Sequence, residues 1–106
     1  MLRILLACGQ GFSSGFIATS MRKACKSKLI EAEVQAVGDI QIPESIEKKT
    51  SDIILIGPHI KYKLEEFQEL AKKNDNPVKI AVMDQKNYSM MNGAAILKDA
   101  LELLDK

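Results

Sequence analysis

Cys8 carries the most nucleophilic kind of side chain in this sequence, and it opens a glycine-rich segment. An apolar run ends at Cys8 and a helical pattern follows the glycines, so the thiol is expected to face a helix N-terminus. A helix terminus and inward-turned backbone N–H groups stabilise a thiolate, and the same donors can hold phosphoryl oxygens. The expected phosphate-binding loop comprises Cys8, Gly9, Gln10, Gly11, Phe12, Ser13, Ser14 and Gly15. A buried, unreactive Cys8 before an ordinary glycine-rich turn is the alternative.

Residues that this loop lacks narrow its chemistry. Protein tyrosine phosphatases need an arginine six residues after the cysteine to clamp phosphate, and Ser14 stands there. No second cysteine lies near Gly11, as a disulfide oxidoreductase would need, and no Gly-Lys pair follows the glycines, as a nucleotide-binding Walker loop would need. The loop is therefore suited to hold a phosphoryl group on sulfur without the arginine that speeds its hydrolysis. A low-molecular-weight phosphatase or arsenate-reductase-like enzyme and a non-enzymatic adaptor domain remain alternatives.

Four short apolar runs predict the β-strands that position this loop. Residues 2–7 and 53–56 are almost continuously apolar, which is typical of strands buried on both faces. Residues 33–37 alternate between polar and apolar, and residues 78–82 carry Lys79 in the middle. Both of the latter patterns favour edge strands.

Helical patterns fill the gaps between these runs. Ser13 or Ser14 is expected to cap a first helix, which has apolar residues on one face. Pro43 favours the first turn of a short second helix that continues to about Lys49.

The second half of the chain contains two further helical patterns. Apolar residues from Ile60 to Ala71 follow helical spacing, and two lysines favour a C-terminus at Lys73. Asn92 is expected to cap a last helix whose apolar residues extend to Leu104.

This alternation of strands and helices predicts a single α/β domain over residues 1–106, with a parallel sheet between two helix layers. Right-handed crossovers and the placement of buried and edge strands predict the strand order 2-1-3-4. The direction of winding then reverses between the first and third strands, and open α/β sheets bind ligands at the carboxyl ends of strands beside such a point. Cys8, Gly57-Pro58-His59 and the segment from Asp84 are expected to converge there.

Several other residues near this point are possible rim or partner contacts, namely Pro58, His59, Asp84 and Tyr88. A surface position or contact with a partner is the favoured role for His59, with direct phosphate binding as the alternative. Asp84 is expected to cap a helix or turn, although an acid role like that of the low-molecular-weight phosphatase aspartate is the alternative. Met90 and Met91, with Phe12 and Tyr88, predict either an adaptable apolar rim around Cys8 or core packing.

Composition excludes several classes of protein. Fifteen basic and 14 acidic residues give a net charge of +1, which favours neither nucleic acid nor an anionic membrane as a partner. The longest apolar run is about five residues. A membrane span needs about 20 apolar residues, and the apolar core of a signal peptide needs about 7–15. We therefore expect a cytoplasmic protein without membrane insertion, in which Cys8 and Cys25 are thiols. Their spacing does not fit a metal site.

Across essentially its whole length, the sequence resembles the enzyme IIB component of the bacterial sugar phosphotransferase system (PTS), lactose/cellobiose (chitobiose) type. The resemblance rests on three elements in order: Cys8-x-x-Gly11-x-Ser13-Ser14, then Ile56-Gly57-Pro58-His59-Ile60-x-Tyr62, then Met83-Asp84-x-x-x-Tyr88-x-x-Met91-Asn92-Gly93. The family loop often continues with a third hydroxyl residue, where this sequence has Gly15.

The resemblance implies a phosphotransferase that needs no cofactor or metal. Cys8 would accept phosphate from a phosphohistidine of enzyme IIA, hold it as a phosphocysteine, and pass it to a sugar bound by the membrane component enzyme IIC. The sugar would be a β-glucoside or disaccharide. Such a transfer depends on a good nucleophile and preorganised donors for the phosphoryl oxygens.

Overall fold

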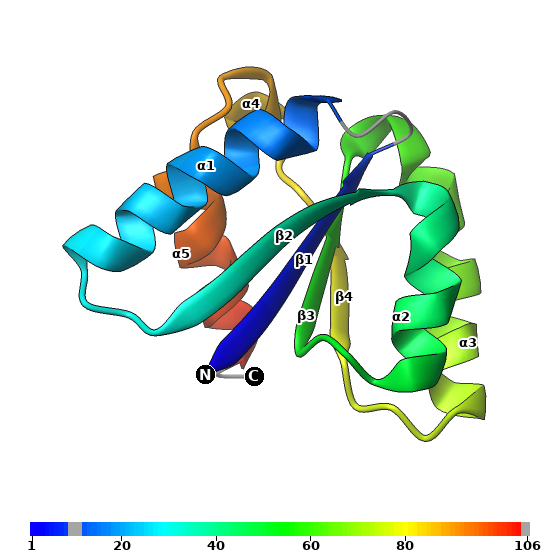
Figure 1. Ribbon diagram of the computed structural model, residues 1–106. Helices are drawn as coiled ribbons and strands as arrows, with labels where there is room; N and C mark the ends of the chain where they lie inside the picture. The colour runs from blue at the N-terminus through cyan, green and yellow to red at the C-terminus, as the bar shows by residue number, and fades with distance from the viewer. Residues whose placement is uncertain (9–11, 105–106) are drawn as a thin grey trace.

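Parallel strands form one sheet in the order β2-β1-β3-β4, as predicted, in the computed structural model of the chain (Figure 1). The structure describes residues 1–8 and 12–104, although for residues 12–14 it describes only the backbone. The elements in chain order are β1 (Leu2–Cys8), α1 (Phe12–Ser27), β2 (Ala32–Gly38), the 3₁₀ turn η1 (Asp39–Gln41), α2 (Ile42–Lys48), β3 (Ile53–Ile56), the 3₁₀ turn η2 (Pro58–Lys63), α3 (Leu64–Lys73), β4 (Lys79–Val82), α4 (Gln85–Ser89) and α5 (Gly93–Leu104).

The central strands divide the core into two layers because successive side chains point to opposite faces. On β1, Ile4 and Leu6 pack with α1 and α5, whereas Leu5 and Ala7 pack with α2 and α3. The two helix layers lie on either side of the sheet in Figure 1. The residues of β3 alternate in the same way, so the continuous apolar runs reflect strands covered on both faces.

The first helix begins earlier than the sequence indicated. Helix α1 starts at Phe12, so Ser13 and Ser14 lie inside its first turn and neither is the N-cap. The serines suggested a cap because their hydroxyls suit that position, but here the helical backbone extends toward the glycines. Helix α2 follows the prediction closely, with Pro43 in its first turn.

The third helix is shorter than the apolar spacing predicted. Ile60 lies in η2 with φ −115° and ψ 21°, outside the helical range, and α3 begins only at Leu64. The Ile60 side chain is nevertheless buried in the same core cluster as Phe67. Burial alone therefore produced the helical spacing, although the backbone at Ile60 belongs to a tight turn.

An extra short helix, α4, precedes the last helix and was not predicted. The Asp84 carboxylate accepts a hydrogen bond from the Asn87 N–H at 3.1 Å and caps α4. The Asn92 side chain accepts from the Ala95 N–H at 3.1 Å, as expected for the cap of the last helix. These caps satisfy N–H groups that have no partner within the helix.

Side chains from neighbouring helices bind carbonyl groups on both edge strands. Arg22 of α1 donates from Nε and Nη2 to the Val34 carbonyl of β2, at 2.9 and 2.6 Å. Gln68 of α3 donates to the Ile80 carbonyl of β4 at 3.5 Å. The helices therefore contact the outer strands through polar groups as well as through the core. Within the described ranges, every helix is too short or too polar to cross a membrane.

Candidate functional site

Cys8 is the last residue of β1, at the carboxyl edge of the sheet. The register places Cys8 beside Gly38 of β2, and the Gly57 N–H donates to the Ala7 carbonyl at 2.8 Å directly after β3. The Met83 N–H donates to the Ile56 carbonyl at 2.8 Å directly after β4. Cys8 and the segments after β3 and β4, which the sequence predicted to converge, therefore lie at the same edge of the sheet (Figure 1).

The absence of a side chain at Gly57 lets two functional groups approach each other. A Cβ atom built on Gly57 would lie 3.3 Å from Cys8 Cβ, 3.0 Å from His59 Cε1 and 3.3 Å from His59 Nδ1. The cysteine side chain and the imidazole thus flank the same small space. Gly57 has φ −67°, so close packing at this position, and not an unusual backbone conformation, makes glycine suitable.

His59 also contacts the aromatic ring of Tyr88. The two ring centres lie 5.8 Å apart, with the ring planes tilted by 50°. Tyr88 belongs to α4 and packs partly against the core beneath α1 and α5. Two residues that are far apart in the sequence are thus brought together beside Cys8, as the predicted strand order requires.

Pro58 and Asp84 shape the segments that carry these rings. Pro58 is half-buried and opens η2, where the Ile60 N–H donates to the Gly57 carbonyl at 3.1 Å. The Asp84 carboxylate is used in capping α4, which favours the capping role over an acid role. Both residues therefore position their neighbours.

An ion pair that the sequence did not reveal joins η1 to η2. The Lys63 ammonium donates to the Asp39 carboxylate, and both side chains are partly buried. This hydrogen bond with Lys63 holds the pKa of the Asp39 carboxyl below its usual range. The pair ties the segment after β2 to the segment that carries His59.

The second cysteine, Cys25, lies in α1 within the core, and burial raises the pKa of its thiol. Cys8 is also buried, with 3% of its surface exposed, and both cysteines are thiols. Cys25 therefore has a structural role in the α1 layer, whereas Cys8 lies at the edge where the loops converge.

Both arginines of the chain are used away from Cys8. Arg3 pairs with Asp52 at 3.0 Å, near the amino end of the sheet, and Arg22 binds the Val34 carbonyl in the middle of β2. A phosphatase of the cysteine type clamps phosphate with an arginine fork. The described contacts engage both guanidinium groups elsewhere, which argues against the phosphatase alternative.

The predicted phosphate-binding loop is only partly visible. Gly9, Gln10 and Gly11 lie outside the described residues, as do the side chains of Phe12, Ser13 and Ser14. The backbone from Phe12 to Gly15 forms the first turn of α1 and not a loop. The first N–H groups of a helix lack partners within it, so this turn can still supply backbone donors.

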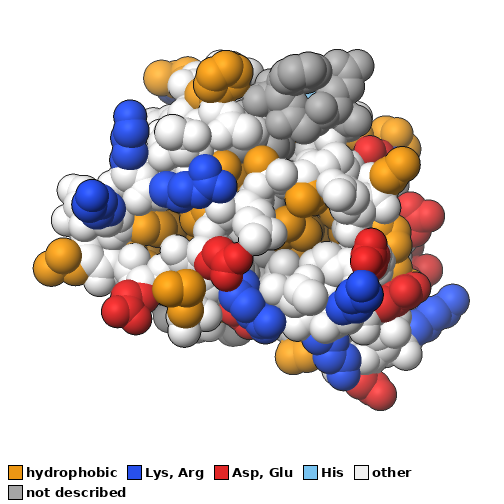
Figure 2. Space-filling model, viewed as in Figure 1, with side chains coloured by type: hydrophobic (Ala, Val, Ile, Leu, Met, Phe, Trp, Pro, Cys, Tyr) orange, Lys and Arg blue, Asp and Glu red, His pale blue; other side chains and the backbone are white. Residues whose placement is uncertain are grey.

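Exposed apolar side chains lie on segments near the carboxyl edge. We call five of them the apolar rim: Phe16, Ile40, Tyr62, Met90 and Met91. Met90 is 63% exposed and Met91 41%, so neither is a core residue. Hydrophobic side chains lie on the surface near α4 at the top of Figure 2, whereas lysines and acidic residues are interspersed on the surface of α2 and α3. The sequence had indicated Met90 and Met91 as possible rim residues. It had not indicated Ile40 or Tyr62, because the sequence alone does not distinguish a single exposed apolar residue from a core residue.

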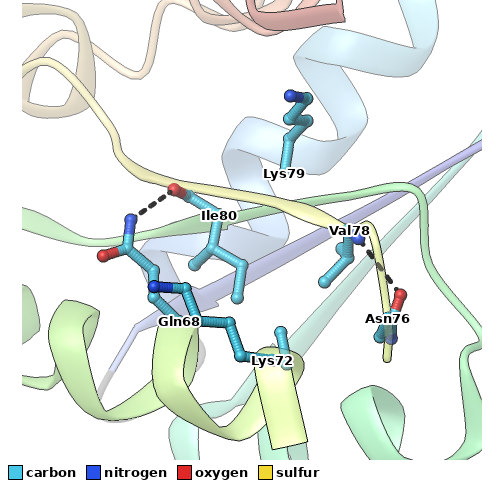
Figure 3. A pocket seen from close by; sticks show the side chains of 7 residues that line it. Gln68, Lys72, Asn76, Val78, Lys79 and Ile80 are labelled. Atoms are coloured by element: carbon cyan, nitrogen blue, oxygen red, sulfur yellow. Dashed lines mark hydrogen bonds between the residues drawn. The ribbon is translucent and has the colours of Figure 1, made fainter. Parts of the chain in front are cut away.

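A groove of about 400 Å³ between α3 and β4 lies elsewhere (Figure 3). Gln68, Lys72 and Ile80 line it, with Asn76, Val78 and Lys79 at the amino end of β4. Because the strands are parallel, this groove starts at the edge of the sheet opposite Cys8. It contributes nothing to the cluster of Cys8, His59 and Tyr88.

Comparison with known proteins decides the family. The model of the family described as PTS system, lactose/cellobiose-specific IIB subunit, matches residues 3–99. The chain belongs to this family of enzyme IIB components. An oligo-β-mannoside-specific EIIB component of Bacillus subtilis (strain 168) is 34% identical over 104 residues, covering 98% of this chain and 97% of that protein.

Solved structures agree with the fold of this enzyme IIB component. The lactose-specific IIB domain of Streptococcus pneumoniae aligns with a TM-score of 0.81 at 14% identity, covering 95% of each chain. The cellobiose-specific IIB component of Borrelia burgdorferi aligns with a TM-score of 0.75 at 26% identity, covering 98% of this chain and 92% of the other. The protein is thus a phosphotransferase, acting as a phosphoryl carrier of a sugar phosphotransferase system.

Proposed function

We propose that Cys8 is the phosphoryl-carrying residue of this enzyme IIB component. The observation that supports this most is the position of Cys8 at the end of β1, four residues before α1 begins. The only histidine of the chain, His59, lies in η2 on an exposed turn. Cys8 is therefore the nucleophile that lies between a strand end and a helix N-terminus, where a thiolate and a phosphoryl group are both stabilised.

Transfer then occurs in two steps. The Cys8 thiolate attacks the phosphorus of a phosphohistidine on enzyme IIA, so that an S–P bond forms, the N–P bond breaks, and its electron pair returns to the imidazole. A hydroxyl oxygen of the sugar on enzyme IIC then attacks phosphorus, the S–P bond breaks, the thiolate is regenerated, and the hydroxyl proton passes to a base. Preorganised donors and orientation account for most of the catalysis in such transfers.

The apolar rim is the proposed docking surface for enzymes IIA and IIC. The rim residues lie on segments that flank the carboxyl edge, where Cys8 ends β1. Exposed methionines adapt to partners of different shape, and a carrier must bind a donor and an acceptor in turn. The sugar is proposed to be β-linked, because the names of the related proteins refer to lactose, cellobiose and oligo-β-mannoside.

Intact-mass measurement tests the proposed carrier. After incubation with phosphorylated enzyme IIA, the wild-type chain should gain one phosphoryl group, which iodine should remove because it cleaves S–P bonds. Cys8→Ser should gain none, and Cys25→Ser should match the wild type. Phosphate on His59, or full sugar phosphorylation by Cys8→Ser with the membrane component, would overturn the assignment. A non-enzymatic adaptor would take up no phosphate in any of these reactions.

Phosphatase activity is the second measurement. The wild-type protein should not turn over p-nitrophenyl phosphate, because Ser14 stands at the position that needs arginine and both arginines bind elsewhere. Turnover that disappears in Cys8→Ser would instead favour the phosphatase alternative.

A further inference from the structure

The imidazole of His59 presents a nitrogen toward the space beside Cys8. Its Cε1 and Nδ1 atoms lie 3.0 and 3.3 Å from the position where a Gly57 side chain would begin, and Cys8 Cβ lies 3.3 Å from the same position. A half-turn of the ring would replace this edge with Nε2 and Cδ2. One nitrogen therefore lies on the edge facing that space in either ring orientation.

The surroundings of His59 restrict where its side chain can move. The buried Ile60 side chain anchors η2 in the core immediately after His59. Tyr88 packs beside the imidazole with a ring-centre distance of 5.8 Å, and the ion pair between Asp39 and Lys63 fixes the far end of η2. An exposed histidine held in this way loses less conformational entropy on binding a ligand than a mobile one.

We propose that His59 donates a hydrogen bond from its imidazole directly to the phosphoryl group on Cys8. This inference rests on the proposal that Cys8 carries phosphate. The group carries negative charge on its oxygens, and neither arginine lies in position to bind it. Of the three side chains in the cluster of Cys8, His59 and Tyr88, only His59 carries ring nitrogens, which are N–H donors suited to phosphoryl oxygens.

This role differs from a docking contact in its chemical consequence. A donor that binds the phosphoryl oxygens stabilises charge during transfer, and so it accelerates the chemical step itself. A docking contact would affect only the concentration of partner needed. The two roles therefore separate in the kinetics of transfer.

The first test uses adducts of Cys8 and requires no partner protein. In a Cys25→Ala background, iodoacetate attaches a carboxylate to Cys8 sulfur, and iodoacetamide attaches a neutral carboxamide of the same shape. Because His59 is the only histidine, its Cε1–H gives a single recognisable proton NMR signal. At the same neutral pH, the carboxylate adduct should move this signal several times further than the carboxamide adduct. Equal movements would mean that His59 does not contact an anion on Cys8.

The second test measures transfer from phosphorylated enzyme IIA. His59→Phe keeps a ring beside Tyr88 but removes both nitrogens, and we expect its saturating rate to fall roughly tenfold, as for loss of one charge-assisted hydrogen bond. His59→Gln keeps an N–H donor and should retain more of the rate. A wild-type rate for His59→Phe, or a loss that excess enzyme IIA restores, overturns the inference.

The two tests also separate this inference from the proposed function. If the wild type takes up no phosphate on Cys8, the proposed function fails, whereas the adduct experiment still measures whether His59 contacts an anion on that sulfur. If Cys8 is phosphorylated normally but the adducts and His59→Phe show no effect, only the role of His59 is refuted. Melting temperatures of both His59 variants should match the wild type closely, because the side chain is exposed.

Discussion

The backbone N–H of Gly93 donates a hydrogen bond to Ser20 Oγ at 3.1 Å, which joins the first residue of α5 to the middle of α1. A Cβ atom at Gly93 would overlap the Met21 nitrogen and would lie 2.7 Å from both the carbonyl carbon and the Cβ of Ser20. The two helices that cover one face of the sheet can therefore approach this closely only because residue 93 is glycine.

We expect Gly93→Ala to destabilise the protein. The added methyl group meets backbone atoms, which cannot rotate away as a side chain can, so α1 and α5 must separate. The free energy of unfolding should fall by about 2 kcal/mol or more, as for other overpacked sites. Urea unfolding measures this change. The control is Gly38→Ala, because a Cβ at Gly38 meets no atom within 4 Å. Equal stability of the two variants would contradict the prediction.

Asp39→Asn should reduce stability in a pH-dependent way. The hydrogen bond from Lys63 lowers the pKa of the Asp39 carboxyl in the folded state, so its contribution is complete above the ordinary aspartate value of about 3.9. The contribution is then lost as the pH falls through the lowered folded pKa.

Thermal melts of the wild type and Asp39→Asn should therefore differ at neutral pH and converge in strong acid. The Asp39 pair also raises the pKa of Lys63, so the advantage of the wild type should decline again at strongly alkaline pH. A stability difference that is unchanged from neutral to strongly acidic pH would show that the ion pair is not its source.

Cys8 should react with iodoacetamide faster than Cys25 in the folded protein. Burial raises the pKa of the Cys25 thiol, so little of it is thiolate near neutral pH. The N-terminus of α1 follows Cys8 closely in the chain and favours its thiolate. Peptide mass spectrometry at a pH of about 6.5 measures the alkylation rates of both cysteines, and equal rates would contradict this prediction.

Gly57→Ala should slow phosphoryl transfer more than it changes stability. The new methyl group would lie 3.0–3.3 Å from the His59 ring and 3.3 Å from Cys8 Cβ, so these groups must shift by a few tenths of an ångström. Backbone φ at Gly57 is −67°, which alanine adopts readily. We expect a roughly tenfold slower transfer, measured with phosphorylated enzyme IIA, and a melting temperature close to that of the wild type. Wild-type transfer would show that this packing is unimportant for the reaction.

The sequence predicted the sheet well because its signals are physical constraints on burial. Residues 53–56 are continuously apolar, and β3 is covered on both faces. The strand order 2-1-3-4 followed from handedness and from which strands carry polar residues, and it is confirmed. The same reasoning correctly brought Cys8 and the segments after β3 and β4 to one edge.

The predictions were less accurate where one sequence feature is compatible with more than one structure. Ile60 fits a helical spacing because it is buried, although its backbone forms a turn. Ser13 and Ser14 suit an N-cap, but α1 begins before them. Helix α4 is short and polar and shows no apolar period. The contacts between His59 and Tyr88 and between Asp39 and Lys63 depend on the folded positions of separate segments, so no local pattern indicates them.

The side chains that bind the edge strands have a consequence for self-assembly. An exposed strand edge offers backbone carbonyls to which another chain can add a strand. Here the guanidinium group of Arg22 occupies the Val34 carbonyl of β2, and the Gln68 amide occupies the Ile80 carbonyl of β4. Each outer strand is thus partly closed to a further strand by its own neighbouring helix. This arrangement disfavours pairing between the edge strands of two copies of the chain.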